Sequence, residues 1–415
     1  MNQNSFKKRI KRYIPPLVFT AVQAGKKNVA KLRRMLVPQK PYRPGTYPFG
    51  VNLAGFIRAE MGLGQSCRCL ATALEAGNIP FSVIAYQHGA CARMGDSAWE
   101  HKMQGIRYAV NLTVINADQL DYAVPILGKE YWNGQYQIAH YAWELSEYPK
   151  QWAGVSRRFQ EIWTPSTFCT QAVAAAVHCP VYTVPYVIEP NIETPRARAW
   201  FGLPEEGFLF LCMFDVSSVI QRKNPQGAID AFIRAFGHSR PDVGLVIKVN
   251  DPRRTPGVQE YLNKLRREYP NIYLLDTVLS RNDTNALIQV CDCFVSMHRS
   301  EGFGLVMAEA MYLEKPVIAT NWSSNTDFMT GENSCPVSYR LIEADRDYAV
   351  YKKGQLWADP DVADCARYMQ RLVDDPGYYE TIAKAGSAAI RQKYSREAAA
   401  QALRDRLAAI EKMGQ

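Results

Sequence analysis

Two glutamates, Glu301 and Glu309, are the residues of this sequence whose setting best suits chemistry. Between them, two glycines join an apolar strand-like run to an apolar helix-like run. A helix that starts at glycines presents free N–H groups and a positive dipole end, which together suit a diphosphate. Glu309 falls among apolar neighbours, where a carboxylate is costly to bury unless it is hydrogen-bonded. We therefore expect Glu309 to bind paired hydroxyls such as those of a ribose; the alternative is a solvent-facing residue of an amphipathic helix.

Basic residues and a second pair of glycines could serve the same anion. Arg222 and Lys223 stand just before a predicted helix, where they could stabilise a departing diphosphate without a metal. Gly62 and Gly64 follow the first predicted strand, and glycine lets backbone amides approach a ligand closely. The alternatives are a solvated helix start for the basic pair and a plain turn for the glycines.

Two histidines are further candidates. His140 lies at a predicted strand end, near Glu144, and His298 precedes Glu301 closely. Either could exchange a proton or a hydrogen bond with a ligand, although a hydrogen-bonded core histidine is the common alternative. The Asp-x-Asp strings at 345–347 and 359–361 do not follow apolar strands, so we interpret them as polar loops and expect no metal site.

Alternating strand-like and helix-like segments must position these residues. The expected strands are 48–56, 81–86, 110–116, 137–143, 161–165, 181–188, 208–214, 244–249, 272–275, 293–297 and 315–320. The expected helices are 65–76, 149–160, 166–177, 225–236, 257–269, 282–290, 304–313, 361–373, 377–392 and 395–412. Such alternation indicates parallel sheets covered on both faces, whose ligands bind beyond the carboxyl ends of the strands.

The pattern restarts after a proline-rich stretch at 187–205, which we interpret as a linker. We therefore predict an α/β protein with two Rossmann-like, doubly wound domains that face a cleft. The N-terminal domain spans 44–190 and the C-terminal domain spans 191–394. The last helix, 395–415, is expected to pack back on the first domain.

The net charge of +9 is concentrated in a basic arm, residues 1–43, which holds twelve Lys/Arg and no acidic residue. Apolar residues recur at helical spacing between about 15 and 36, which favours an amphipathic helix on an anionic membrane surface. A plain tail is the alternative, and too few aromatics are present to suggest nucleic acid. With no membrane-spanning run and cysteines inside apolar segments, we expect a cytoplasmic protein, peripheral at the inner face of the membrane.

The sequence resembles the retaining GT-B glycosyltransferases of family four. The resemblance covers nearly all of 48–412 and is carried by the Glu-x7-Glu element together with GVNLAGFIRAEMGLG, YAWELSEYPKQW, FDVSSVIQRKNP, SMHRSEGFG, KPVIAT and WADPD. One departure stands out: the arginine that the family usually places several residues before Lys223 is absent. Its function then falls to Arg222 or Arg299.

The resemblance implies roles for individual residues. Glu309 resembles the acid that holds the ribose, Glu301 the acid near the donor sugar, and Lys223 the cation that neutralises the diphosphate. It implies catalytic roles for Glu301, His140 and Lys223. The implied donor-binding residues are Glu309, Arg222, Lys223, Gly302, Phe303, Gly304, Leu305, Gly62, Gly64, Ser324, Asn325 and His298.

The activity implied by the resemblance is transfer of a hexose, such as mannose or glucose, with retention of configuration. The donor would be a GDP- or UDP-linked sugar, with no other cofactor. The resemblance places this donor in the C-terminal domain and the acceptor in the N-terminal domain. The acceptor would be a saccharide, and the basic arm favours a lipid-linked one, as in surface polysaccharide biosynthesis. The alternatives are a GT-B nucleotide-sugar epimerase and a non-catalytic, membrane-associated assembly protein.

Overall fold

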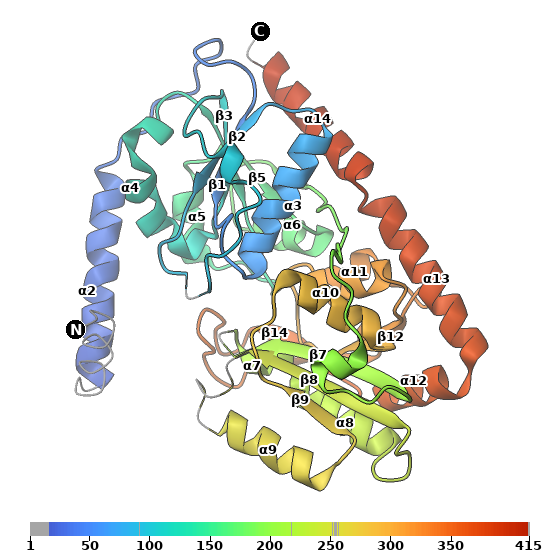
Figure 1. Cartoon of the computed structure of the whole chain (residues 1–415). Helices are drawn as coiled ribbons and strands as arrows, with labels where there is room; N and C mark the ends of the chain where they lie inside the picture. Colours follow the sequence, from blue (N-terminus) through green and yellow to red (C-terminus); the bar gives the residue numbers. More distant parts are fainter. Residues whose placement is uncertain are drawn as a thin grey trace, which may run out of the picture.

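The computed structural model describes residues 16–90, 92–216, 218–250, 252, 255 and 257–413. It has two α/β lobes, one above the other in Figure 1. The N-terminal lobe is built on a sheet within 51–183, and the C-terminal lobe on a sheet within 208–337. These sheets fall inside the two predicted domains, and the expected α/β architecture with two Rossmann-like units is confirmed.

The N-terminal lobe has six parallel strands in the order β2-β1-β3-β4-β5-β6. They are β1 (Val51–Gly55), β2 (Phe81–Ala85), β3 (Val110–Val114), β4 (Tyr136–His140), β5 (Glu161–Thr164) and β6 (Val181–Thr183). The central strands are buried on both faces, as expected for a sheet covered by helices. The helices are α3 (Gly62–Ala76), α4 (Leu120–Tyr131), α5 (Lys150–Ser156) and α6 (Thr167–Ala174).

The C-terminal lobe repeats this plan with the parallel order β12-β11-β10-β7-β8-β9. Its strands are β7 (Phe208–Asp215), β8 (Val243–Asn250), β9 (Ile272–Leu275), β10 (Cys293–Ser296), β11 (Val317–Thr320) and β12 (Cys335–Val337). Its helices are α7 (Ile220–Lys223), α8 (Pro225–Ala235), α9 (Val258–Glu268), α10 (Arg281–Val290), α11 (Leu305–Tyr312) and α12 (Val362–Asp374).

Strand order determines where a ligand can bind. The chain moves outward from β7 to β8 and β9, then returns to place β10 on the other side of β7. A crevice forms where the order reverses, beyond the carboxyl ends of the strands. The segment after β7 carries Arg222 and Lys223, and the segment after β10 carries Glu301. The topology therefore brings residues about 80 positions apart to one point, about where the family resemblance places the donor.

Some elements differ from expectation. Helix α4 was not predicted, because Pro125 and Gly128 interrupt its pattern; Gly128 is non-helical within it, with φ 79°. An antiparallel hairpin, β13 (Tyr339–Glu343) and β14 (Leu356–Pro360), was also missed. Asp359 therefore lies in a strand, whereas the string at 345–347 lies in the loop of the hairpin. Helices α5 and α6 end several residues earlier than predicted.

The predicted helix of the basic arm corresponds to α2 (Pro16–Met35); residues 1–15 lie outside the described part of the chain. Helix α2 packs along α4 on the outer side of the N-terminal lobe (Figure 1). Ala30 is buried there, and Arg34 pairs with Asp121 at 2.9 Å. No helix in the described ranges is long and apolar enough to cross a bilayer.

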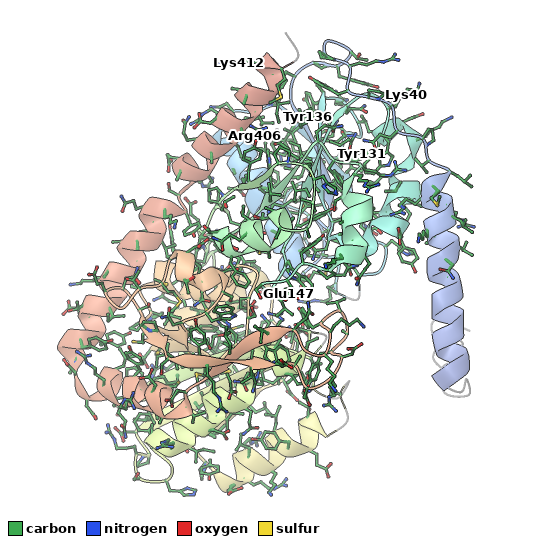
Figure 2. The ribbon with its side chains drawn as sticks, turned by 180° about the vertical axis from the view of Figure 1, so that it is seen from behind. Lys40, Tyr131, Tyr136, Glu147, Arg406 and Lys412 are labelled. Carbon is green, nitrogen blue, oxygen red and sulfur yellow. The ribbon has the colours of Figure 1, made fainter. Side chains whose placement is uncertain are left out.

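Two long helices, α13 (Pro376–Lys393) and α14 (Arg396–Lys412), run along one side from the C-terminal to the N-terminal lobe (Figure 1). Helix α14 packs against α3. Its Arg406 pairs with Glu161 of β5, which is fully buried and also accepts hydrogen bonds from Tyr136 and Trp163. Figure 2 shows Arg406 beside Tyr136. The final helix therefore completes the N-terminal lobe.

Replacing Arg406 should destabilise the protein, because it would leave the carboxylate of Glu161 buried without its cation. We expect Arg406→Ala to lower the free energy of unfolding by about 3 kcal/mol, as when one partner of a buried ion pair is removed. Arg404→Ala, at an exposed position of the same helix, is the matched control and should have little effect. Urea unfolding followed by circular dichroism measures both, and equal losses would contradict the role of this pair.

Candidate active site

A cluster of three charged side chains lies where β7 and β10 end. Glu301 accepts from Lys223 (Nζ–Oε1, 2.5 Å) and from Arg222 (Nη1–Oε2, 3.2 Å). Burial alone would raise the pKa of Glu301, but the two cations outweigh it and lower this pKa to about 2. The acid is therefore ionised at neutral pH, and Lys223 and Arg222 are two cations that a diphosphate could bind at this point.

Arg222 is the buried member of the basic pair. Its guanidinium donates to the carbonyl of Ser300 at 2.6 Å and lies 3.9 Å from the carboxylate of Glu144, which belongs to the N-terminal lobe. Arg299, by contrast, pairs with Asp359 and lies over the ring of Trp357. Of the two candidates for the missing family arginine, Arg222 alone contacts Glu301 in the described structure.

Glu309 lies in the second turn of α11, and its side chain is only 3% exposed. Its partner is Arg281, the first residue of α10, whose two Nη groups reach both carboxylate oxygens. Burial would lower the pKa of Arg281, but Glu309 overrides this and raises it. The hydrogen-bonded partner that a buried acid requires is thus supplied by the protein itself.

Glu309 borders a cavity of about 90 Å³. The other walls include Gln65 and Arg68 of α3, Val187 of the linker, and Arg281. Because α3 belongs to one lobe and α10 and α11 to the other, this opening lies between the lobes. Glu309 is therefore neither in bulk solvent nor sealed away, which are the two arrangements that would rule out a ligand-binding role.

The residues between the two acids have different structural roles. Gly304 has φ 94°, a left-handed conformation that favours glycine, and it leads directly into Leu305 at the start of α11. Gly302 lies against the backbone of Trp143 in the N-terminal lobe. The ring of Phe303 is buried against Tyr186, so its side chain belongs to the core. As a donor contact, Phe303 is limited to its backbone.

Several other predicted donor-binding residues lie behind the site. Ser324 donates to the carbonyl of Glu301 at 2.6 Å, and Asn325 donates to Thr320 at 2.9 Å. Both side chains are buried; Ser324 holds the loop of Glu301 in place, and Asn325 holds the end of β11. Gly62 begins α3, whereas a Cβ on Gly64 would lie 1.9 Å from the carbonyl oxygen of Ala59. Gly64 is thus required by a tight turn.

Both candidate histidines are completely buried. His140 ends β4 beside the ring of Tyr186, and neither of its nitrogens has a hydrogen-bond partner among the described residues. Burial lowers its pKa to about 3 and that of His298 to about 4. Each ring is neutral at physiological pH, and neither contacts Glu301 through a described hydrogen bond.

The sequence reasoning missed Arg281, which is the cation closest to Glu309. A signal was present, since Ser280 followed by Asp283 is typical of a helix start, and this start follows the strand β9. It also missed the contact between the lobes. Ser166 donates to the carbonyl of Gly302 at 3.1 Å, and Ser300 donates to the carbonyl of Glu144.

The fold matches solved structures over most of the chain. Sucrose-phosphate synthase from Thermosynechococcus elongatus is 18% identical with a TM-score of 0.62, covering 88% of this chain and 100% of that one. The Anabaena protein Alr3699/HepE, solved with UDP and glucose, is 14% identical with a TM-score of 0.59, covering 87% and 100%. At such identities the likeness defines the fold alone, and that fold is GT-B.

Sequence comparison then gives the family. Residues 214–375 match the family described as glycosyl transferases group 1. The matched part holds Arg222, Lys223, Glu301 and Glu309, and it supports the resemblance that the motifs indicated. A segment is also 28% identical, over 118 residues, to the mouse alpha-1,3/1,6-mannosyltransferase ALG2. The segment is 28% of this chain and spans 24% of the length of that relative.

The buried histidines predict a pH dependence of stability. The unfolded chain protonates histidine near pH 6.5, whereas folded His140 does so only near 3, so the unfolded state binds more protons between these values. The free energy of unfolding should therefore fall as pH falls from 6.5, by about 1.4 kcal/mol per pH unit for each such group. Urea unfolding between pH 7 and pH 5 measures this pH dependence, at pH values above those at which folded Glu301 takes up a proton. His140→Asn should flatten the dependence, and the exposed control His101→Asn should not; an unchanged slope for His140→Asn would contradict the assignment.

Proposed function

We propose that this chain is a glycosyltransferase that moves a hexose, such as mannose or glucose, from a nucleotide diphosphate sugar to a hydroxyl of a saccharide acceptor. The observation that carries the proposal is that both acids are buried where the lobes meet: Glu309 borders an opening between the lobes, and Glu301 holds the cations Lys223 and Arg222. Two relatives support it: one is a mannosyltransferase, and another was solved with UDP and glucose.

In this proposal the donor lies along the ends of β7 and β10. Its ribose hydroxyls would donate to Glu309, sharing the carboxylate with Arg281. Its diphosphate would bind the cationic side chains of Lys223 and Arg222, which contact Glu301 in this structure. Negative charge develops on the departing diphosphate, and cations held in place beforehand stabilise it most effectively. Glu301 would then accept hydrogen bonds from the sugar hydroxyls.

Retention of configuration and independence of a metal are further parts of the proposal. The family resemblance implies attack of the acceptor on the same face as the leaving group, with the phosphate assisting deprotonation of the acceptor. His140 would then contact the donor sugar or the acceptor, because it lies at the carboxyl end of β4 in the opposite lobe. Opening of the lobes would have to expose it, since it is buried here.

A lipid-linked acceptor at an anionic membrane surface is the partner that α2 favours. Helix α2 packs on α4 through one face, whereas Val29 and Leu32 on another face are 50% and 61% exposed. Leu36, which directly follows the helix, is 81% exposed. Lys31 and Arg33 are exposed beside them. An apolar face flanked by cations is what an interfacial membrane helix presents.

Glu309→Gln should cost activity because it weakens the hydrogen bonds of the carboxylate to the ribose. We expect kcat/KM for sugar transfer to fall roughly 10- to 100-fold, as when a hydrogen bond to a charged group is lost. Glu314→Gln, exposed just after the same helix, is the matched control. The measurement is transfer of a radiolabelled hexose from GDP- and UDP-sugars to saccharide acceptors. Full activity of Glu309→Gln would remove the main support.

The same assay separates the alternatives. An epimerase would yield an isomerised free donor, detected by chromatography, without labelled acceptor. A non-catalytic protein would show no binding of any nucleotide sugar by calorimetry. Either result would refute the proposed activity.

The membrane contact is tested on the exposed face of α2. We expect Leu32→Asp with Leu36→Asp to weaken binding to phosphatidylglycerol vesicles at least about tenfold, because each removes an apolar side chain from the bilayer surface. Leu341→Asp, at an exposed position of the distant hairpin, is the control. Co-sedimentation with vesicles measures the binding, and undiminished sedimentation of the α2 variant would contradict this role.

A further inference from the structure

A second and larger cavity, of about 420 Å³, lies within the C-terminal lobe. Its walls come from the end of β7, from α7, α8 and α9, and from the hairpin β13–β14. Its described lining includes neither Glu301 nor Glu309 and no residue of the N-terminal lobe. It is thus distinct from the opening between the lobes, and its volume is in the range of small-molecule sites.

Aromatic rings form much of this wall. Trp357 of the hairpin is 3% exposed, and the ring of Tyr348 packs against it with centroids 5.3 Å apart. Tyr261 of α9, 40% exposed, and Phe214 at the end of β7 also line the cavity. The guanidiniums of Arg299 and Arg346 already lie over Trp357 and Tyr348, so Tyr261 is the lining ring that is open to a ligand. The negative face of such a ring suits a flat, weakly positive C–H surface, such as one side of a pyranose ring.

Polar groups at the same cavity suit hydroxyls. Gln221 of α7 and Glu343 of β13 both line it, and neither side chain has a hydrogen bond or an ion pair within the described ranges. An amide can donate and accept, and a carboxylate accepts from two hydroxyls at once. Aromatic faces together with free amide and carboxylate groups are a combination that recognises a polyhydroxylated ring.

The charges of the lining exclude an anionic ligand. The guanidinium of Arg299 is already paired with Asp359 at 3.1 Å. Asp345 accepts from the hydroxyl of Tyr348 at 2.6 Å, which leaves Glu343 as a negative group facing the cavity without a described cation. A phosphate or nucleotide would be repelled here, whereas a neutral saccharide would not. We propose that this cavity is a binding site for a neutral hexose unit, separate from the nucleotide-sugar site.

Helix α7 contributes residues both to the wall of the cavity and to the cluster of Glu301, Lys223 and Arg222. Gln221 lines it, while the next two residues of α7, Arg222 and Lys223, contact Glu301. The N–H of Arg299 also donates to the carbonyl of Arg222 at 2.7 Å. A bound hexose would therefore contact the short helix that carries the cations of the site. The proposal that a hexose binds here depends on the cavity alone. If the proposed function holds, this hexose would be a distal unit of the acceptor.

The test is saturation-transfer NMR on the full chain with two neutral probes, maltotriose and mannotriose, at millimolar concentration. We expect at least one to bind, and Tyr261→Ala and Glu343→Gln each to weaken that binding about fivefold, the effect of one lost contact. Both positions are exposed, so thermal unfolding should show that the variants remain folded. Tyr339→Ala, an exposed tyrosine of the hairpin outside the cavity lining, is the matched control.

Added GDP or UDP should leave the trisaccharide signal unchanged, and Glu309→Gln should retain it. Failure of the proposed transferase activity would then leave this site standing. Absence of binding for both trisaccharides, undiminished binding by both cavity variants, or displacement of the saccharide by a nucleotide would each overturn the proposal.

Discussion

Two carboxylates, Glu301 and Glu309, are buried where the lobes meet, and each must be neutralised in place. Lys223 and Arg222 do this for one acid, and Arg281 does it for the other. A buried carboxylate without a partner would cost several kcal/mol, so the position of each cation is a condition for the fold as well as for any chemistry. The three cations come from the ends of β7 and β9, and the parallel sheet brings these ends to one edge.

The loop that carries Glu301 also makes contacts between the lobes. Ser166 bonds to Gly302, and Ser300 bonds to the backbone at Glu144. The two chain crossings between the lobes are themselves joined, because the N–H of Ile188 donates to the carbonyl of Tyr394 at 2.9 Å. This hydrogen bond holds the two crossings together, while Ser166 and Ser300 hold the lobes together at the loop of Glu301.

The sequence predicted the alternating elements well, because the strands are short, mostly apolar runs and helices such as α8, α9 and α12 are amphipathic. Helix α4 was not predicted because residues such as Pro125 and Gly128 usually end a helix. The hairpin was not predicted because β13 is mostly exposed. The motif around Glu301 indicated where the acids lie along the chain. It could not show that Phe303 and Ser324 face inward or that Arg281 reaches Glu309, since those facts depend on packing between distant segments.

The pairing of Glu161 with Arg406 spans 245 positions of the chain. During translation the first lobe leaves the ribosome well before α14 does. The carboxylate of Glu161 therefore lacks its cation while the whole second lobe is synthesised. Completion of the early half thus depends on the late end of the polypeptide. A ribosome-stalled or truncated chain lacking α14 would hold an incomplete first lobe, open to chaperones and proteases.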